Sequence, residues 1–218
     1  MPLTILLSGF GPFPGEPCNP TGALVQGLAR LRRPALSDVR LVPHVFQTSY
    51  RAVDRDLPRL LTELQPDAVL MFGLSAKAGC LQVETRARNA ISAFRDADGQ
   101  QGSSTCIVPG GPRALWFGAP AARLAVAARK ARIQTVISRD AGRYLCNYLS
   151  WRAIEATAWP AGPSFAAFIH VPKLWQATVR RSAQGARAWR MRDLLRGGQA
   201  ILLAAAAETR RRKHMKQR

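Results

Sequence analysis

The sequence predicts a single α/β domain, a three-layer α/β/α sandwich around a mostly parallel, twisted sheet. Two observations support this fold class. Short apolar runs recur along the 218-residue chain, and segments with helical periodicity separate them. That alternation is typical of parallel strands whose connecting helices cover both faces of a sheet. Hydrophobic residues make up 47% of the chain, which is enough for a sizeable core.

The chain begins with a predicted strand, a loop and a helix. Residues 3–8 are a short apolar run, typical of a buried strand. A loop rich in glycine and proline follows at residues 9–18. Asn19 and Pro20 then begin a helix that runs to about Leu31, because proline is favoured at the first helical position.

A second strand and a second helix are predicted next. Residues 39–46 are rich in valine, but Pro43 lacks the N–H of a central strand and therefore favours an edge position. Ser49 can cap the helix that follows, in which Pro58 favours a kink or a break. Residues 66–73 combine a loop with a further buried strand.

The second half of the chain continues the alternation. Residues 81–88 alternate well enough for one strand, and residues 95–114 are polar and form a loop or hairpin. The remaining predicted elements are, in order, a helix at 120–131, a strand at 134–138, a helix that ends near residue 158, a strand at 165–171 and a helix over about 190–210.

Residues 1–209 account for all these elements as one domain, and residues 210–218 form a basic tail that is free to be disordered. The chain carries 32 Lys and Arg against 13 Asp and Glu, a net charge of +19. Such an excess often indicates nucleic-acid binding, but zinc-finger spacing, an aromatic RNA-binding signature and a clear helix-turn-helix are missing. We therefore expect no specific nucleic-acid partner, and attribute the dispersed arginines to a genome rich in arginine codons.

The sequence also argues against membranes, metals and disulfides. No run of roughly 18 or more apolar residues occurs, and the amino end lacks the pattern of a signal peptide, so we expect no membrane association. The four cysteines are irregularly spaced without a CxxC pair, which argues against a zinc site or a disulfide framework. A cytoplasmic location is the simplest interpretation.

One cysteine occupies a position that favours reactivity. Cys146 follows an apolar strand and a turn at Ala141 and Gly142, and it lies in the first turn of a predicted helix. The positive end of the helix dipole and the unpaired N–H groups there favour the thiolate, which is the nucleophilic form. Cys18, Cys80 and Cys106 do not begin a helix in this way.

A cysteine nucleophile needs a base, and the chain has three histidines. His214 lies in the basic tail, and His44 follows Pro43 in the predicted edge strand, where a structural role is favoured. His170 ends an apolar strand, at the kind of sheet edge where open α/β sheets bind ligands. Its pattern fits a buried core histidine equally well.

The carboxylate that would orient an imidazole is less certain from the residues alone. Glu84 stands in a strand-like segment, while Asp140 lies close to Cys146 in sequence. A salt bridge between Glu84 and one of the many arginines is the favoured interpretation without further information. Asp96 and Asp98 lie in a polar loop, where solvation is expected.

The loop after the first strand contains Phe10 and Phe13 among glycines and prolines. These rings can form a wall for a flat substrate or simply cap the core. The loop lacks the Gly-Lys-Ser/Thr ending of a phosphate-binding loop and departs from GxGxxG, so we discount nucleotide binding.

Three segments together resemble the pyroglutamyl peptidase I family of cysteine peptidases, also called pyrrolidone carboxyl peptidases. Residues 5–20 are similar to its TGFxPFxGxxxNP start, residues 138–149 to the SxxAGxYxCN segment around its nucleophile, and residues 168–172 to its FIHVP motif. A weaker match joins residues 66–73 to Glu84 and Asn89. The segments occur in family order.

The resemblance implies that the catalytic residues are Cys146 as nucleophile, His170 as base and Glu84 as the orienting acid. It also implies that Phe10 and Phe13 sandwich the pyroglutamyl ring while a third residue, Asn19, helps to hold the site. An α/β/α sandwich without cofactor or metal is implied, as are a cytoplasmic location and a homotetramer. The implied substrates are peptides and proteins with an amino-terminal pyroglutamyl residue.

The sequence departs from the family pattern around Glu84. The Gly-Gly-Arg that the family has after Gly73 is missing, and Thr85 stands where the family usually has arginine. The family's arginine beyond Asn89 has no secure counterpart, since Phe94 or Arg95 lies nearby. An alternative function is therefore a catalytically impaired family member that acts as a binding or regulatory protein.

Overall fold

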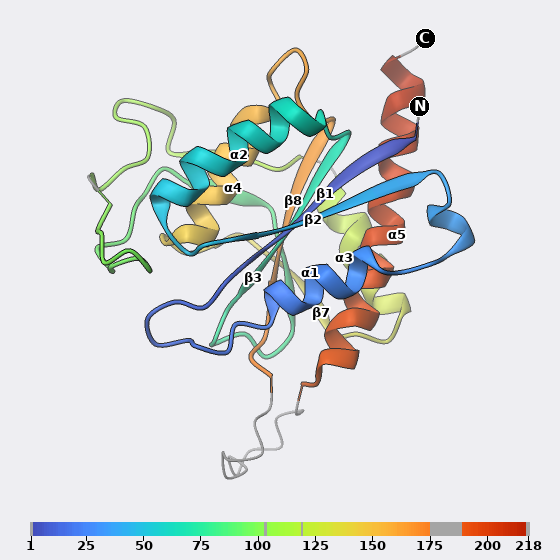
Figure 1. Cartoon of the computed structure of the whole chain (residues 1–218), viewed down its shortest axis with the longest axis horizontal. Coiled ribbons are helices and arrows are strands. Elements are labelled where there is room, and N and C mark those ends of the chain that lie inside the picture. The colour runs from blue at the N-terminus through green and yellow to red at the C-terminus, as the bar shows by residue number, and fades with distance from the viewer. Residues whose placement is uncertain (1, 103, 119, 175–188, 217–218) are drawn as a thin grey trace.

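A computed structural model describes residues 2–102, 104–118, 120–174 and 189–216 of the chain (Figure 1). A six-stranded sheet has the order β2–β1–β3–β8–β4–β7. Its strands are β1 (Leu3–Phe10), β2 (Val39–Phe46), β3 (Ala68–Leu74), β4 (Leu81–Glu84), β7 (Thr135–Ser138) and β8 (Phe165–Val171). A separate two-stranded sheet pairs β5 (Arg86–Arg88) with β6 (Ala114–Trp116).

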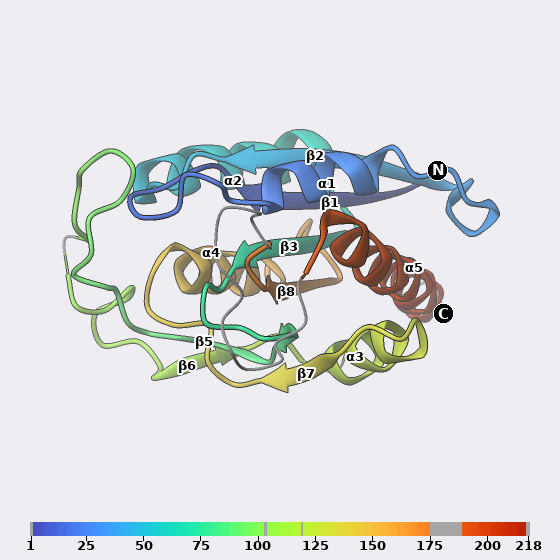
Figure 2. The same cartoon turned by 90° about the horizontal axis from the view of Figure 1, so that it is seen from below.

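Helices cover both faces of the large sheet, which confirms the predicted α/β/α sandwich. They are α1 (Thr21–Ala29), α2 (Tyr50–Leu64), α3 (Pro120–Lys130), α4 (Leu145–Ala156) and α5 (Met191–Lys216), with a 3-10 turn at Pro34–Leu36. The apolar sides of α2 and α4 pack on one face, and those of α1, α3 and α5 pack on the other. Figure 2 shows α3 beside α5 in the second of these layers.

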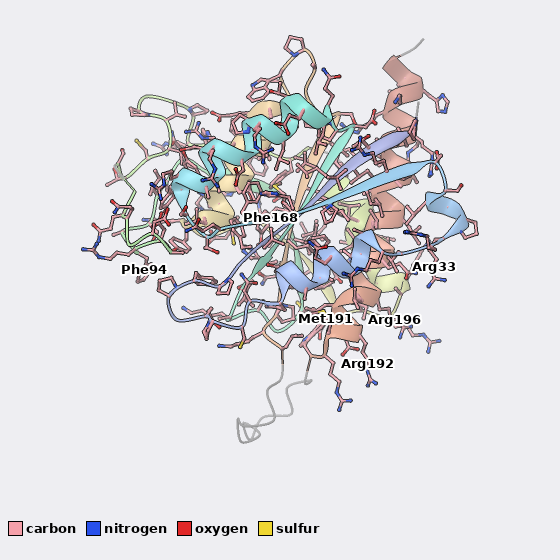
Figure 3. The ribbon with its side chains drawn as sticks, viewed as in Figure 1. Arg33, Phe94, Phe168, Met191, Arg192 and Arg196 are labelled. Carbon is pink, nitrogen blue, oxygen red and sulfur yellow. The ribbon has the colours of Figure 1, made fainter. Side chains whose placement is uncertain are left out.

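Strand β8 lies inside the sheet and shows how alternation assigns side chains to the two layers. Ala167 and Ile169 belong to the core beneath α1, α3 and α5, whereas Ala166 and Phe168 belong to the core beneath α2 and α4. Phe168 lies near the centre of the molecule (Figure 3). By the same alternation, His170 points toward the α4 side.

The sheet is mostly parallel, with one reversal that the sequence did not reveal. β2, β1, β3 and β8 run in one direction, but β4 pairs with β8 in the antiparallel sense, and β7 is parallel to β4. β7 therefore runs opposite to β8. The predicted single strand at 81–88 is also divided, because the chain changes sheets at Thr85, whose N–H donates to Ser138 O at 2.9 Å.

The amino-terminal elements follow the sequence pattern closely. β2 is an edge strand, as Pro43 indicated. Ser49 caps α2, with Oγ accepting from the N–H of Ala52 at 3.1 Å. Pro58 lies inside α2 without ending it, contrary to the break that was considered.

The basic carboxyl-terminal segment is helical, because α5 continues to Lys216. The buried carboxylate of Glu208 anchors it by accepting from Arg123, Arg211 and Arg212. Lys213 adds an ion pair with Asp67 at 3.1 Å. The expectation of a disordered tail at 210–218 is therefore corrected for the residues up to 216, since these arginines meet fixed carboxylates.

No helix in the described part of the chain has both the length and the apolarity to cross a membrane.

Candidate active site

The turn before α4 fixes the start of that helix. Gly142 adopts φ +79°, a conformation that glycine takes without strain, and its N–H donates to Asp140 Oδ1 at 3.1 Å. Arg88 pairs with Asp140 at 3.1 Å and so ties the turn to β5. α4 then begins at Leu145 with Cys146, which is partly buried, in its first turn.

A buried asparagine next to the cysteine clamps α4 to β5. Asn147 accepts from the N–H of Arg88 at 2.7 Å and donates to the carbonyls of Arg88 and Ala90 at 2.9 and 3.0 Å. Its side chain is fully buried. The sequence reasoning did not single out Asn147, although a polar residue on an apolar helix face was a signal that it has buried partners.

The sulfur of Cys146 lies against β3 at Gly73. A Cβ placed on Gly73 would lie 2.6 Å from the sulfur and 2.6 Å from Cζ of Phe168. Gly73 is in register with His170 on the neighbouring strand β8. The thiol and the imidazole therefore meet through β3 and β8. They do not meet through β7 and β8, the strands that precede Cys146 and carry His170, because these two strands run in opposite directions.

The imidazole of His170 is held by a buried carboxylate. Nδ1 of His170 lies 2.8 Å from Oε1 of Glu84, and both side chains are almost inaccessible. The antiparallel register places Gln82 opposite His170, so Glu84 reaches the ring from the diagonal position on the same face. The second oxygen, Oε2, is buried and has no hydrogen-bond partner among the described residues.

The electrostatics favour a protonated His170. Burial disfavours its charged form, but the adjacent Cys146 and the Glu84 carboxylate outweigh burial and raise the pKa of His170 to about 10. At neutral pH the site therefore holds an imidazolium between a sulfur and a carboxylate. An imidazolium stabilises a neighbouring thiolate.

The cysteine and histidine line a cavity of about 420 Å³. Its aromatic wall contains Phe10, Phe13 and Tyr144, and the ring centroids of Phe13 and Tyr144 are 6.1 Å apart. Phe10 is almost fully buried and also packs on Phe46, so it belongs to the cavity and to the core.

Two hydrogen-bonded groups hold this wall in place. Asn19 lines the cavity, donates to the carbonyl of Gly11 at 3.0 Å and accepts from the N–H of Thr21. Tyr144 donates its hydroxyl to the carbonyl of Arg95 at 2.9 Å, and burial raises its pKa to about 12, which keeps the hydroxyl protonated. Tyr144 lies within the motif at residues 138–149, but the sequence predicted no role for it.

The other titratable residues that the sequence pointed to have other partners. Asp140 lines the cavity but pairs with Arg88 rather than with the imidazole. His44 lies 3.7 Å from Asp56, and burial lowers its pKa. Asp96 was expected to be solvated, but it is buried and accepts three backbone N–H groups of its own loop and of α2. In the described ranges no cluster of His, Cys, Asp and Glu could hold a metal ion.

Comparisons with known proteins identify the family of the chain. The sequence model of the pyroglutamyl peptidase family matches residues 3–208. The chain is 33% identical to pyrrolidone-carboxylate peptidase 1 of Ralstonia nicotianae, with 78% of this chain and 79% of the relative covered. It is 29% identical to the pyrrolidone-carboxylate peptidase of Pyrococcus furiosus, over 84% and 87% of the two chains. The crystal structure of pyrrolidone carboxyl peptidase from Thermococcus litoralis superposes with a TM-score of 0.86 at 26% identity, covering 97% of this chain and 96% of the other.

Proposed function

The chain belongs to the pyroglutamyl peptidase family, and from this premise we propose that it is a cysteine peptidase that hydrolyses the amide bond after an amino-terminal pyroglutamyl residue. The observation that carries the proposal is the hydrogen-bonded His170–Glu84 pair beside a thiol at a helix start. That arrangement contains a nucleophile, a base and a group that orients the base.

Recognition of the substrate would rely on shape and hydrogen bonds, because the pyroglutamyl lactam carries no charge. Phe10 and Phe13 offer apolar faces to the flat ring, and Tyr144 extends the same wall. Asn19 holds the backbone of the loop that carries both phenylalanines. A concave, mostly apolar cavity with a few polar groups suits such a small ligand.

Acylation would begin with attack of the Cys146 sulfur on the pyroglutamyl carbonyl carbon. The first N–H groups of α4 have no intrahelical partner and no side-chain cap among the described residues, so they can receive the developing oxyanion. One such donor is worth about 3–4 kcal/mol in serine peptidases. His170 then donates its proton to the departing amine, the C–N bond breaks, and a thioester remains on Cys146.

Deacylation would reverse the role of the histidine. His170, now neutral, takes a proton from water, and the resulting hydroxide attacks the thioester carbon. The C–S bond breaks, free pyroglutamate leaves, and the proton on His170 restores the starting state. Glu84 acts throughout as a positioning residue, because its contact with Nδ1 directs the other ring nitrogen to the cavity.

A binding or regulatory role without catalysis is the second candidate. The buried Glu84 Oε2 without a partner favours it, as does Thr85 at the position where the family usually has arginine. Thr85 directs its hydroxyl to the carbonyl of Ser138 at 2.8 Å rather than to the carboxylate. The intact contact between His170 and Glu84 favours the hydrolase.

Turnover of a pyroglutamyl aminocoumarin amide distinguishes the hydrolase from the binding or regulatory protein. We expect release of the fluorophore by the wild type and by Cys106→Ala, whose thiol lies outside the cavity, but not by Cys146→Ala. A well-folded wild type that binds a pyroglutamyl peptide without cleaving it would establish the binding role. Equal turnover by Cys146→Ala would refute the assignment of the nucleophile.

A cytoplasmic location and a homotetramer belong to the same proposal and rest on the family resemblance. Light scattering coupled to size-exclusion chromatography measures the subunit number directly. A monomeric mass at micromolar concentration would contradict the tetramer.

A further inference from the structure

Two cations line the active-site cavity without a carboxylate partner. Lys77 and Arg143 are exposed, and neither forms an ion pair with an acid among the described residues. The acid that lines the same cavity, Asp140, is neutralised by Arg88 at 3.1 Å. The cavity mouth therefore carries unbalanced positive charge, on a chain whose net charge is already +19.

The turn that carries Lys77 is hydrogen-bonded to β8 at the residue after His170. Ser75 donates its N–H to the carbonyl of Val171 at 3.0 Å, and Ala78 donates to the carbonyl of Ser75 at 3.0 Å. Val171 follows His170 on β8. Lys77 is therefore held within the turn just past the end of the strand that presents the imidazole.

Arg143 has an equally fixed origin. It stands between Gly142, whose N–H is bound by Asp140, and Tyr144, whose hydroxyl is bound to Arg95. Its backbone thus lies in a hydrogen-bonded turn ahead of α4, and the residue is exposed. Both cations accordingly project from ordered turns next to the reacting groups.

The path of the leaving peptide follows from the proposed chemistry. The pyroglutamyl ring occupies the aromatic wall, to which Phe10 contributes from the end of β1, Phe13 from the loop after it and Tyr144 from the start of α4. The departing amine has to receive its proton from His170, so the residue after the scissile bond lies near that ring, where Ser75 and Lys77 of the 75–78 turn line the same cavity.

We propose that Lys77 and Arg143 make the cavity mouth select peptides with an acidic residue immediately after the pyroglutamyl residue. The inference rests on the proposed peptidase function and specifies its substrate class. An exposed charge pair changes an equilibrium by about two- to fivefold, and salt screens it. We therefore expect a preference of about three- to tenfold in kcat/KM for glutamate over glutamine at that position in low salt, which declines in about 0.5 M NaCl.

The test compares two peptide amides, pyroglutamyl-glutamyl and pyroglutamyl-glutaminyl, which differ only in charge. The cavity variant is the double substitution Lys77→Gln with Arg143→Gln. Its matched control is the double substitution Arg32→Gln with Arg33→Gln, which removes the same amount of positive charge. Arg33 lies at the opposite end of the molecule from Phe94 (Figure 3), and Phe94 precedes the Arg95 carbonyl that binds Tyr144. The ratio of the two kcat/KM values is taken within each enzyme, so it does not depend on the active fraction.

We expect the ratio to fall to within about twofold in the cavity variant and to stay at the wild-type value in the control. Replacement of both cations by glutamate should invert the preference. A wild-type glutamate-to-glutamine ratio of kcat/KM near one, or an equal fall of this ratio in both double variants, would overturn the inference. In either case, turnover of the two peptides would still support the proposed peptidase function. Absence of turnover with either peptide and with the aminocoumarin amide would overturn the proposed function together with the inference.

Discussion

Gly73→Ala is the sharpest test of how the cysteine is placed. The added Cβ would lie 2.6 Å from Sγ of Cys146 and 2.6 Å from Cζ of Phe168, so both neighbours have to give way. To reach ordinary contact the sulfur has to retreat by about 0.8 Å, from 2.6 to 3.4 Å. A misplacement of about 1 Å costs roughly 100-fold in rate. We expect a loss of that size in kcat/KM for the aminocoumarin amide.

The same substitution has a calculable effect on stability. Overpacking a core costs about 1–3 kcal/mol, while replacing glycine by alanine returns about 0.4–1 kcal/mol through the unfolded chain. The net loss of about 1–2 kcal/mol corresponds to a Tm lower by about 2–8 °C in a chain of this size. Gly79→Ala is the matched control, since no atom lies within 4 Å of its built Cβ. Full activity of Gly73→Ala, or an equal loss in Gly79→Ala, would refute the placement of the sulfur over β3.

Three further predictions follow from the charges of the site and of α5. Because the pKa of His170 is raised to about 10, the charged form of His170 stabilises the fold fully below pH 6.5. Both this stabilisation and kcat/KM should decline as the pH rises towards 10. In Glu84→Gln the alkaline limb of the pH–rate profile should move to lower pH, and an unmoved limb would contradict the pairing of Glu84 with His170. His170→Ala should slow alkylation of Cys146 by iodoacetamide at pH 7 by about tenfold or more, measured by mass spectrometry, and an unchanged rate would show that the imidazolium does not stabilise the thiolate. Glu208→Gln should lower the free energy of unfolding by about 1–2 kcal/mol in denaturant titrations, because the buried carboxylate loses its charged hydrogen bonds while its arginine partners stay hydrated. Glu63→Gln, which breaks a surface pair, should change the free energy of unfolding by less than about 0.5 kcal/mol. Equal effects would contradict the anchoring of α5.

Local structural features were predictable from the sequence where a few neighbouring residues determine them. The cap at Ser49, the edge position given by Pro43 and the helix start at Cys146 each depend on a few neighbouring residues. The direction of β4 was not predictable, because side chains alternate with the same period in parallel and antiparallel strands. The residues alone therefore could not decide between Glu84 and Asp140 as the partner of the imidazole; the family resemblance indicated Glu84.

Burial of charge was the other feature that composition could not predict. The basic carboxyl-terminal segment was expected to be free to be disordered, but Arg211 and Arg212 meet a buried carboxylate at Glu208, which lies 85 residues from its third partner, Arg123. Asp96 was likewise assigned to solvent from its polar loop, yet its carboxylate organises that loop by accepting backbone N–H groups. Both errors arise because a long-range partner decides whether a charged group is exposed.

The proposed nucleophile, base and orienting acid stand over three neighbouring strands, β3, β8 and β4. Cys146 lies over Gly73 of β3, His170 belongs to β8 and Glu84 to β4, and these strands are hydrogen-bonded side by side. Neighbouring strands are about 4.8 Å apart, so the sheet itself sets the order of thiol, imidazole and carboxylate. The reversal of β4 matters here, because it brings the last residue of that strand to the diagonal position beside His170. Sheet hydrogen bonds hold Gly73, His170 and Glu84 in this row, and the turn that carries Lys77 follows the end of β3. A substitution at Lys77 should therefore test the proposed substrate preference without moving the row.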